Sequence, residues 1–382
     1  MKTSLIILTL LALLGCKGPT LPDPPEVPES PEVPEVPAYT LDENIGMMLL
    51  VGFYGQEVDS SKNPEIISAL RDYHVGSVIL FDYDGPSKTR GRNIKSAEQV
   101  TRLCTQLRAY NPQLLVSIDQ EGGSVSRLSS RYGFPSIMSA QKSAAQGLDT
   151  VRKCAHLTAE ILKSCGINLN FAPVADVNIN PSCPVIGGMG RSFSSNPDMV
   201  AQCCKIWIEE QQGVGVVSCM KHFPGHGSSK GDTHKGLVDV TDTWQRCELE
   251  PYRDLNNPYL MVMTAHVINR QLDPSGLPAS LSPAITSYLR DTLGFQGVIV
   301  TDDLAMGAID KEYSFKKAIR MAVLAGADLL CLSNNGGKYD VNIVPRTVKI
   351  IKKMVADGDI SEERIRQSAD RVRALATSSQ VK

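Results

Sequence analysis

The stretch from 221 to 237, KHFPGHGSSKGDTHKGL, holds three of the six histidines of the chain, at positions 222, 226 and 234. A metal site is one interpretation, because imidazole is the commonest protein ligand for zinc. Histidines four residues apart chelate a metal when they lie on a helix, but Pro224 and the glycines beside it make a helix improbable. A second interpretation is a stiff loop whose histidines only satisfy backbone groups. We expect the third, an active-site loop without a metal.

This loop could supply an acid/base, and a distant aspartate could supply a nucleophile. Asp302 follows the apolar run GVIV and Thr301, and would be held at the tip of a strand. A carboxylate that attacks, together with a group that protonates the leaving oxygen, performs retaining glycoside hydrolysis. Asp232 and His234 could supply that proton, because a histidine paired with a carboxylate exchanges protons near neutral pH. A flexible loop could bring the pair in after the substrate binds.

Eight short apolar runs alternate with helix-length segments such as 97–110 and 199–212, which is typical of buried parallel strands joined by crossover helices. Eight such units predict a TIM-type (β/α)8 barrel, an α/β fold with a single catalytic domain over residues 39–382. A doubly wound open sheet is the alternative, but no GxGxxG motif follows the first run. The runs are 45–53, 75–82, 113–119, 167–177, 214–222, 259–267, 295–303 and 327–333.

Polar residues at the ends of these runs are the candidates for chemistry, since the active site of such a barrel lies at the carboxyl ends of its strands. Any single aspartate among them could instead cap a helix. The candidates are Asp82, Asp119, Asp176, Lys221 with His222, His266, and Asp302 with Asp303.

The first residues of the chain predict export and a lipid anchor. Residues 1–15 have a positive start and an apolar run too short to span a bilayer comfortably, so they indicate a signal peptide. Gly15 followed by Cys16 resembles a bacterial lipobox, in which Cys16 becomes the lipidated N-terminus. Residues 16–38 then form a spacer rich in proline and glutamate, a composition that favours an extended polyproline conformation.

Charge and cysteine content further restrict the possible partners and sites. A formal net charge of −2 argues against a nucleic-acid partner, because phosphates demand a positive face. Apart from Cys16, the chain has nine scattered cysteines without the spacing of a metal site. We expect most of them to be free, buried thiols, although one disulfide is compatible with the sequence.

Four motifs in order resemble glycoside hydrolase family 3, in particular its β-N-acetylglucosaminidase branch in the bacterial lipoprotein form. They are IDQEGGSVSRL at 118–128, PVIGGMGRSF at 184–193, KHFPGHG followed by DTH, and GVIVTDDLAM at 297–306. The resemblance implies a covalent glycosyl-aspartate on Asp302, and His234 in a dyad with Asp232 as acid/base. It also implies a sugar-binding set, without cofactor or metal: Asp119, Arg127, Arg191, Lys221 and His222. One departure is Ser124, because the family usually has GGRV where this chain has GGSV.

The resemblance implies an exo-acting enzyme that removes terminal GlcNAc, with peptidoglycan fragments as the expected source. The predicted lipid anchor indicates the bacterial cell envelope, and we expect a monomer, although the sequence leaves the oligomeric state open. Chitin or glycan oligosaccharides, and phosphate in place of water as acceptor, stay open. An exo-β-glucosidase of the same family and a non-catalytic sugar-binding lipoprotein are the alternative functions.

Overall fold

The computed structural model describes residues 39–253 and 257–378. Residues from Tyr39 onward form one compact unit. The predicted signal peptide 1–15, the lipidation site Cys16 and the spacer 16–38 lie outside the described residues. Within the described residues, no helix combines the length and the apolar character needed to cross a membrane.

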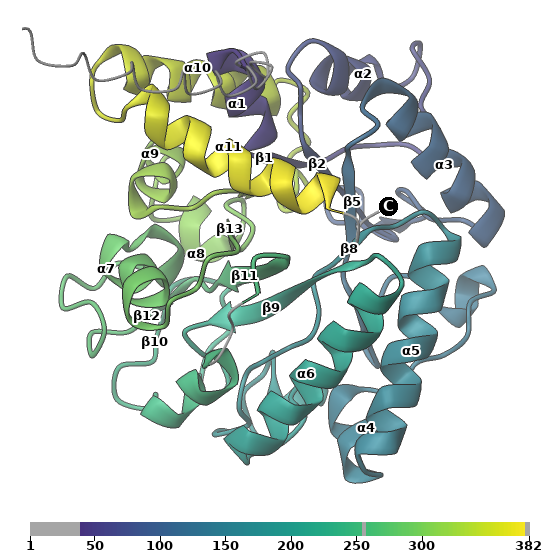
Figure 1. Ribbon diagram of the computed structural model, residues 1–382, viewed down its shortest axis with the longest axis vertical. Coiled ribbons are helices and arrows are strands. Elements are labelled where there is room, and N and C mark those ends of the chain that lie inside the picture. Colours follow the sequence, from purple (N-terminus) through teal and green to yellow (C-terminus); the bar gives the residue numbers. More distant parts are fainter. Residues whose placement is uncertain (1–38, 254–256, 379–382) are drawn as a thin grey trace, which may run out of the picture. The chain divides into compact units, whose positions relative to one another are not determined.

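Eight parallel strands form the central sheet, and their order around it is the order in which they follow one another along the chain (Figure 1). β13 and β14 complete the ring, because Val300 bridges Leu329 in parallel and the Thr301 N–H donates to the Leu329 carbonyl at 3.1 Å. The predicted (β/α)8 barrel is therefore confirmed. The strands are β1 (Leu49–Gly52), β2 (Ser77–Leu80), β5 (Leu115–Ile118), β8 (Leu169–Asn170), β9 (Val217–Phe223), β11 (Leu260–Thr264), β13 (Val298–Thr301) and β14 (Leu330–Leu332).

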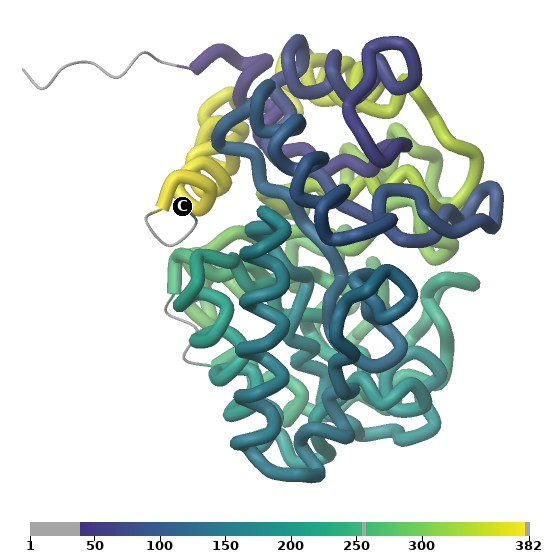
Figure 2. Tube along the Cα trace, turned by 90° about the vertical axis from the view of Figure 1, so that its right-hand side faces the viewer, coloured from purple at the N-terminus to yellow at the C-terminus, as the bar shows by residue number. Residues whose placement is uncertain are grey.

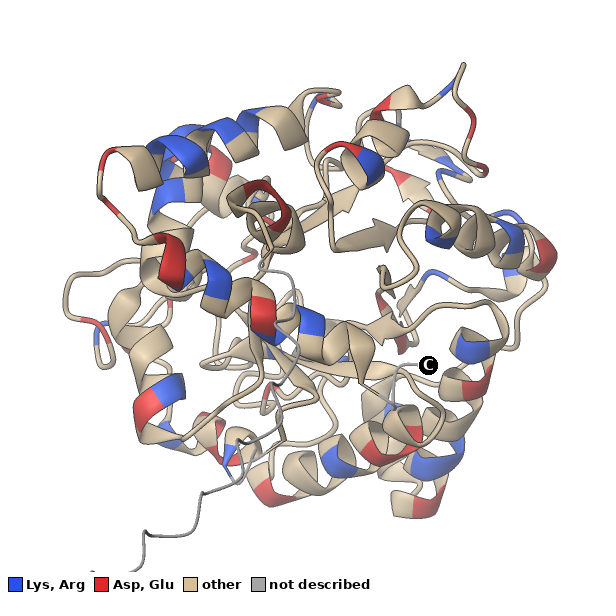
Figure 3. Ribbon diagram, turned by 45° about the horizontal axis from the view of Figure 1, so that its top comes forward, with Lys and Arg blue, Asp and Glu red and all other residues tan. Residues whose placement is uncertain are grey.

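The helices surround this barrel (Figure 2), and Lys, Arg, Asp and Glu residues occur along many of them (Figure 3). The predicted helix 97–110 coincides with α3, which Ser96 caps by accepting a hydrogen bond from the Gln99 N–H. The helices are α1 (Leu41–Met47), α2 (Pro64–Arg71), α3 (Ala97–Tyr110), α4 (Ala140–Ala145), α5 (Leu148–Ser164), α6 (Pro197–Gly213), α7 (Pro283–Ser287), α8 (Gly307–Asp310), α9 (Phe315–Ala325), α10 (Ile343–Ala356) and α11 (Glu362–Thr377).

Three short strand pairs lie outside the barrel sheet. β3 (Tyr83–Asp84) pairs with β4 (Thr89–Arg90), and β6 (Gln120–Gly122) pairs with β7 (Val125–Ser126), both antiparallel. β10 (Val238–Asp239) runs parallel to β12 (Val267–Ile268).

The barrel interior is filled by apolar side chains from alternate strand positions. Leu50 of β1 belongs to this inner cluster, whereas its neighbours Leu49 and Val51 belong to the cluster between the sheet and the helices. This alternation follows from the two-residue period of a strand. Val372 and Leu375 of α11 join the inner cluster, so this helix packs against the interior of the barrel.

The nine cysteines within the described residues form no disulfide, and eight of them are buried. Cys247 is partly exposed. Burial raises the pKa of the Cys104 thiol to about 12, which keeps it protonated. The prediction of free, buried thiols is thus confirmed for all of these residues except Cys247, which is free but not buried.

Candidate active site

A cavity of about 660 Å³ lies at the carboxyl ends of the strands. Seven of the eight predicted site residues line it, and the eighth, Asp232, contacts it through His234. Those that line the cavity are Asp119, Arg127, Arg191, Lys221, His222, His234 and Asp302. The fold thus brings together residues that are separated by as much as half of the chain.

Four side chains of alternating charge form one side of this cavity, and we call them the ion-pair wall: Asp119, Glu121, Arg191 and Lys221. The Lys221 Nζ lies 2.7 Å from Asp119 Oδ1 and 2.7 Å from Glu121 Oε1. Arg191 donates to both oxygens of Glu121, at 2.8 and 2.7 Å. Burial opposes ionisation of Glu121, but Arg191 and Lys221 outweigh it and lower the pKa of Glu121 to about 2. The wall is therefore fully charged at neutral pH.

Glu121 was not among the predicted site residues. It lies two positions after Asp119 in the motif DQEGG, and both side chains reach Lys221. The two-residue period of an extended segment puts such side chains on one face, so the signal for Glu121 was present in the sequence.

His222 is oriented by Asp176. Its Nδ1 lies 2.6 Å from Asp176 Oδ2, and its backbone N–H donates to Asp176 Oδ1 at 3.2 Å. Asp176 Oδ1 also accepts the backbone N–H of His226 at 2.8 Å. Asp176 is completely buried and does not line the cavity. This corrects its prediction as a candidate at the barrel mouth: it lies behind the mouth and fixes the tautomer and direction of His222.

Two other strand-end candidates also fall outside the cavity lining. Asp82 is buried and pairs with Arg90 at 2.8 Å. His266 is buried with Nδ1 2.6 Å from Ser280 Oγ and Nε2 2.8 Å from the Asp303 carbonyl oxygen. Both ring nitrogens of His266 therefore have partners within the protein, which leaves none to contact a substrate.

Asp302 and Asp303 are adjacent in sequence, but their carboxyl groups differ in environment. Burial opposes ionisation of Asp302, yet the imidazoles of His266 and His222 hold its pKa below the ordinary value. Burial raises the pKa of Asp303, and its carboxylate accepts hydrogen bonds from the Ser333 hydroxyl and from the Ser333 N–H at 3.0 Å. Asp302 thus presents an ionised carboxylate to the cavity, while Asp303 fixes the segment after β14.

Asp232 and His234 lie in the segment 231–237, which we call the acid/base loop. Asp232 Oδ1 accepts the backbone N–H of His234 at 2.9 Å and lies 2.8 Å from its Nδ1. Burial raises the pKa of Asp232, but these two contacts outweigh it and the pKa is lowered. The dyad predicted from the sequence therefore has the geometry in which a carboxylate orients an imidazole and stabilises its charged form.

Glu248 is a buried carboxylate behind the glycine-rich segment 224–229. A Cβ on Gly225 would lie 2.8 Å from the Glu248 side chain. Its Oε2 atom is buried and has no hydrogen-bond partner among the described residues. Burial raises the pKa of Glu248 to about 7. Within the described residues no Lys or Arg forms an ion pair with Glu248, whereas Glu121 pairs with both Arg191 and Lys221.

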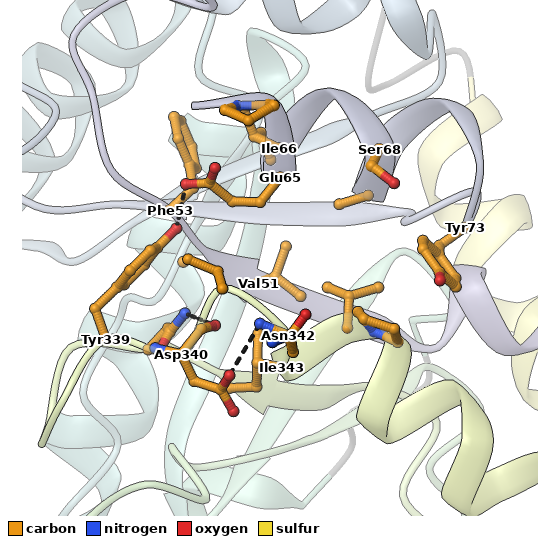
Figure 4. A pocket seen from close by; sticks show the side chains of 17 residues that line it. Val51, Phe53, Glu65, Ile66, Ser68, Tyr73, Tyr339, Asp340, Asn342 and Ile343 are labelled. Carbon is orange, nitrogen blue, oxygen red and sulfur yellow. Dashed lines mark hydrogen bonds between the residues drawn. The ribbon is translucent and has the colours of Figure 1, made fainter. Parts of the chain in front are cut away.

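A second cavity, of about 510 Å³, lies between α2 and the chain that leads into α10 (Figure 4). Tyr339 and Glu65 point toward each other across it, and the Tyr339 hydroxyl donates to the Glu65 carboxylate at 2.8 Å. None of the predicted site residues lines this cavity. In residues 39–253 and 257–378, no group of three or more His, Cys, Asp or Glu is placed to hold a metal.

Comparison with known families matches residues 40–375 to the model of the glycosyl hydrolase family 3 N-terminal domain. A β-hexosaminidase of Alkalilimnicola ehrlichii is 33% identical over 331 residues, which cover 83% of this chain and 87% of the relative. β-Hexosaminidase A of Pseudoalteromonas piscicida is 32% identical over 343 residues, which cover 82% of this chain but only 55% of the relative.

Solved structures give the same result. A family 3 β-N-acetylglucosaminidase from Paenibacillus superposes with a TM-score of 0.79 and 35% identity, covering 88% of this chain and 62% of that one. A β-N-acetylhexosaminidase from Beutenbergia cavernae superposes with a TM-score of 0.77 and 28% identity, covering 89% of this chain and 99% of that one. The chain therefore spans somewhat more than half of some relatives and nearly all of others.

Proposed function

The chain belongs to glycosyl hydrolase family 3 and is a glycoside hydrolase, and from that premise we propose that it is a retaining, exo-acting β-N-acetylglucosaminidase. Its substrate is a terminal GlcNAc residue, and its acid/base is the Asp232–His234 dyad. The observation that carries the proposal is an ionised Asp302 in the same cavity as this dyad. These are the nucleophile and the proton carrier that a two-step displacement needs.

In the first step, Asp302 attacks the anomeric carbon, the glycosidic bond breaks, and His234 gives its proton to the departing oxygen. In the second step, His234 takes a proton from water, the water oxygen bonds to the anomeric carbon, and the Asp302 carboxylate is released. The configuration at the anomeric carbon is retained because it is inverted twice. Asp232 stabilises the imidazolium form that precedes the first step and follows the second.

The ion-pair wall is the proposed sugar-binding surface. Asp119, Arg191 and Lys221 hold one another in fixed positions and present charged donors and acceptors to the cavity. Hydrogen bonds from charged groups to sugar hydroxyls are stronger than those between neutral groups. Arg127 extends this surface, with its guanidinium 3.5 Å from Asp119 Oδ2, and His222 completes it.

Peptidoglycan fragments are the proposed source of the terminal GlcNAc, because the sequence predicts a lipoprotein of the bacterial cell envelope. This part of the proposal rests on Cys16 and the segments around it. Replacement of Cys16 by Ser should release the protein from membranes, since a single lost anchor leaves only the barrel domain and a polar spacer. Unchanged partition of Cys16→Ser into a detergent phase would contradict the anchor.

Hydrolysis of nitrophenyl glycosides tests the activity. We expect fast release of nitrophenol from the β-N-acetylglucosaminide and slow release from the β-glucoside. The reverse order would favour the exo-β-glucosidase, and no release from either would favour a sugar-binding lipoprotein.

A test of the nucleophile uses Asp302→Ala. This variant should lose turnover and still bind GlcNAc, because Asp302 forms the glycosyl-enzyme and contributes less to holding the ring. Mass spectrometry after trapping with a slow 2-fluoro substrate should find the label on Asp302. Activity of Asp302→Ala above about 1% of wild type would remove Asp302 from this role.

A further inference from the structure

Within the acid/base loop, the side chain of His234 is exposed, whereas the neighbouring Thr233 is buried. The side chain of His234 is 66% exposed, whereas Thr233 is 2% exposed. An imidazole with so little packing around it is not placed by its own contacts, apart from the bond to Asp232. The position of His234 over the cavity must therefore be set by the backbone of the loop.

Helix α8 contacts that backbone on both sides of His234. The Ala308 N–H donates to the Thr233 carbonyl oxygen at 3.0 Å. The Lys311 Nζ, just after α8, donates to the Lys235 carbonyl oxygen at 2.7 Å. The chain therefore rests on α8 through the two carbonyl groups that flank His234.

Gly307, the first residue of α8, makes the closest approach. A Cβ at this position would lie 2.4 Å from the carbonyl oxygen of His234 and 3.1 Å from its carbonyl carbon. Both atoms are backbone, so no side chain could move aside. The φ of Gly307 is not left-handed, which means that alanine is excluded here by the loop and not by backbone conformation.

The other side of the loop is held by His226. Its Nε2 lies 3.3 Å from the Thr233 Oγ1, and its backbone N–H is bound by Asp176, which also orients His222. The loop thus lies between the segment that carries His222 and the helix that begins five residues after Asp302. Any shift of α8 away from the loop would change the relation between the acid/base and the nucleophile.

We infer that Gly307, the Ala308 amide and Lys311 form a seat that positions His234 for proton transfer by supporting the backbone of the acid/base loop. The inference rests on the proposed function, since it takes His234 as the acid/base. Gly307 is small because the seat requires contact between two backbones, and Lys311 fixes the far end of the loop. The seat makes the helix after the nucleophile part of the acid/base machinery.

Gly307→Ala tests the seat. The added methyl group should displace His234 by about 1 Å, and a displacement of that size can lower a rate by about 100-fold. We expect this loss on nitrophenyl GlcNAc, which needs a proton on its leaving group, and a much smaller loss on dinitrophenyl GlcNAc in the first step. A burst of dinitrophenol followed by slow turnover should accompany it, because the second step still needs the base.

Two glycine variants serve as matched controls. A Cβ on Gly213, at the end of α6, or on Gly236, inside the loop, would meet no atom within 4 Å. Gly213→Ala should leave the rates of hydrolysis of both substrates unchanged. Gly236→Ala should lower the rates of hydrolysis of both substrates by less than Gly307→Ala does, although Gly236 lies in the same loop. Lys311→Met should shift the leaving-group dependence in the same direction as Gly307→Ala by a few-fold, because it removes one hydrogen bond.

The outcomes separate the seat from the function on which it rests. His234→Gly provides the reference for a lost acid/base. If His234→Gly shows the leaving-group dependence and Gly307→Ala loses equal activity on both substrates, or none, the seat is overturned and the proposed function stands. If wild type hydrolyses neither substrate, the proposed function and the seat fail together. A thermal midpoint of Gly307→Ala close to that of wild type should accompany the expected result.

Discussion

The ion-pair wall and the acid/base loop contribute to the same cavity but are built in opposite ways. In the wall, Lys221 and Glu121 are 2% and 5% exposed, and every charge has an opposite charge within hydrogen-bond distance. In the loop, His234 is mostly exposed and Asp232 is its one carboxylate partner in the described residues. The first region is fixed by burial, and the second is held through its backbone.

This difference matches what the proposed function requires of each region. Charged groups that hold a sugar gain strength in a buried environment, and their mutual ion pairs keep them in place before the sugar arrives. A group that gives a proton to a leaving oxygen and then takes one from water needs access to both. Under the proposed function, the molecule separates the sugar-binding groups, which are preorganised, from the proton carrier, which stays accessible.

The largest expected effect is the loss of the proton carrier. His234→Gly should lower kcat on unactivated substrates by about 10² to 10⁴-fold, with little change in thermal stability because the side chain is exposed. With dinitrophenyl GlcNAc, the rate of the first step should be restored in the variant, whereas the second step should stay slow. Stopped-flow measurement should therefore show a burst of dinitrophenol. Equal losses on activated and unactivated substrates without a burst would assign His234 to binding or structure, and would return Asp303, which also lines the cavity, to consideration as the acid.

Removal of a wall carboxylate should have the opposite signature. Glu121→Ala removes the carboxylate that binds both the largely buried Arg191 and the buried Lys221, and we expect the free energy of unfolding to fall by about 3–5 kcal/mol. Chemical denaturation measures this change. Glu363→Ala is the matched control, because Glu363 also binds an arginine through both oxygens but is exposed, and its loss should cost less than about 1 kcal/mol. Similar values for the two variants would contradict the distinction between wall and surface.

Glu248 sharpens the comparison within the buried region, because it is a buried glutamate without a cation. In the folded protein it keeps its proton up to a pKa of about 7, whereas in the unfolded chain it loses the proton near 4.5. Between these pH values the unfolded state binds fewer protons, so the free energy of unfolding falls as pH rises, by about 3 kcal/mol in total. Glu248→Gln should remove this decline.

Denaturation at pH 5 and at pH 8 checks the prediction for Glu248. The variant should lose less stability than wild type between the two pH values, and its relative gain should be largest at pH 8. A parallel decline in Glu248→Gln and wild type would show that other groups cause it.

The smallest expected effect concerns the contact between the loop and the segment of His226. Thr233→Val keeps the shape of the buried side chain and removes its hydroxyl from His226 Nε2. A single hydrogen bond of this kind contributes about 0.5–1.5 kcal/mol, so kcat on nitrophenyl GlcNAc should fall by less than about 10-fold. A loss as large as that of His234→Gly would place the hydroxyl itself in the chemistry.

The sequence predicted the barrel because its signal is local: each strand lies in an apolar run, and the order of the runs is the order of the strands. The bounds of the individual strands were less predictable. The run 167–177 yields a strand of only two residues, Leu169–Asn170. The chain beyond it still bonds to β9, with Val174 bridging Lys221, and brings Asp176 behind His222.

Site residues were predictable where a motif carried them and less so where partners decide their role. His266 ends an apolar run as Lys221 does, but Ser280 and the Asp303 carbonyl, which no local pattern reveals, occupy its ring. Glu121 lies inside a motif that was recognised, and its importance appears only with Arg191, seventy residues away.

Closure of the barrel has a consequence for biogenesis. β1 pairs with β2 on one side and with β14 on the other, so its second edge stays unpaired until residues 330–332 have been made. β13 waits for the same segment. A nascent chain that ends before this segment therefore exposes two open strand edges, which are sites for wrong pairing with other chains. Chains released from the ribosome before residue 330 should therefore aggregate, and a holding chaperone would have most to protect at this stage.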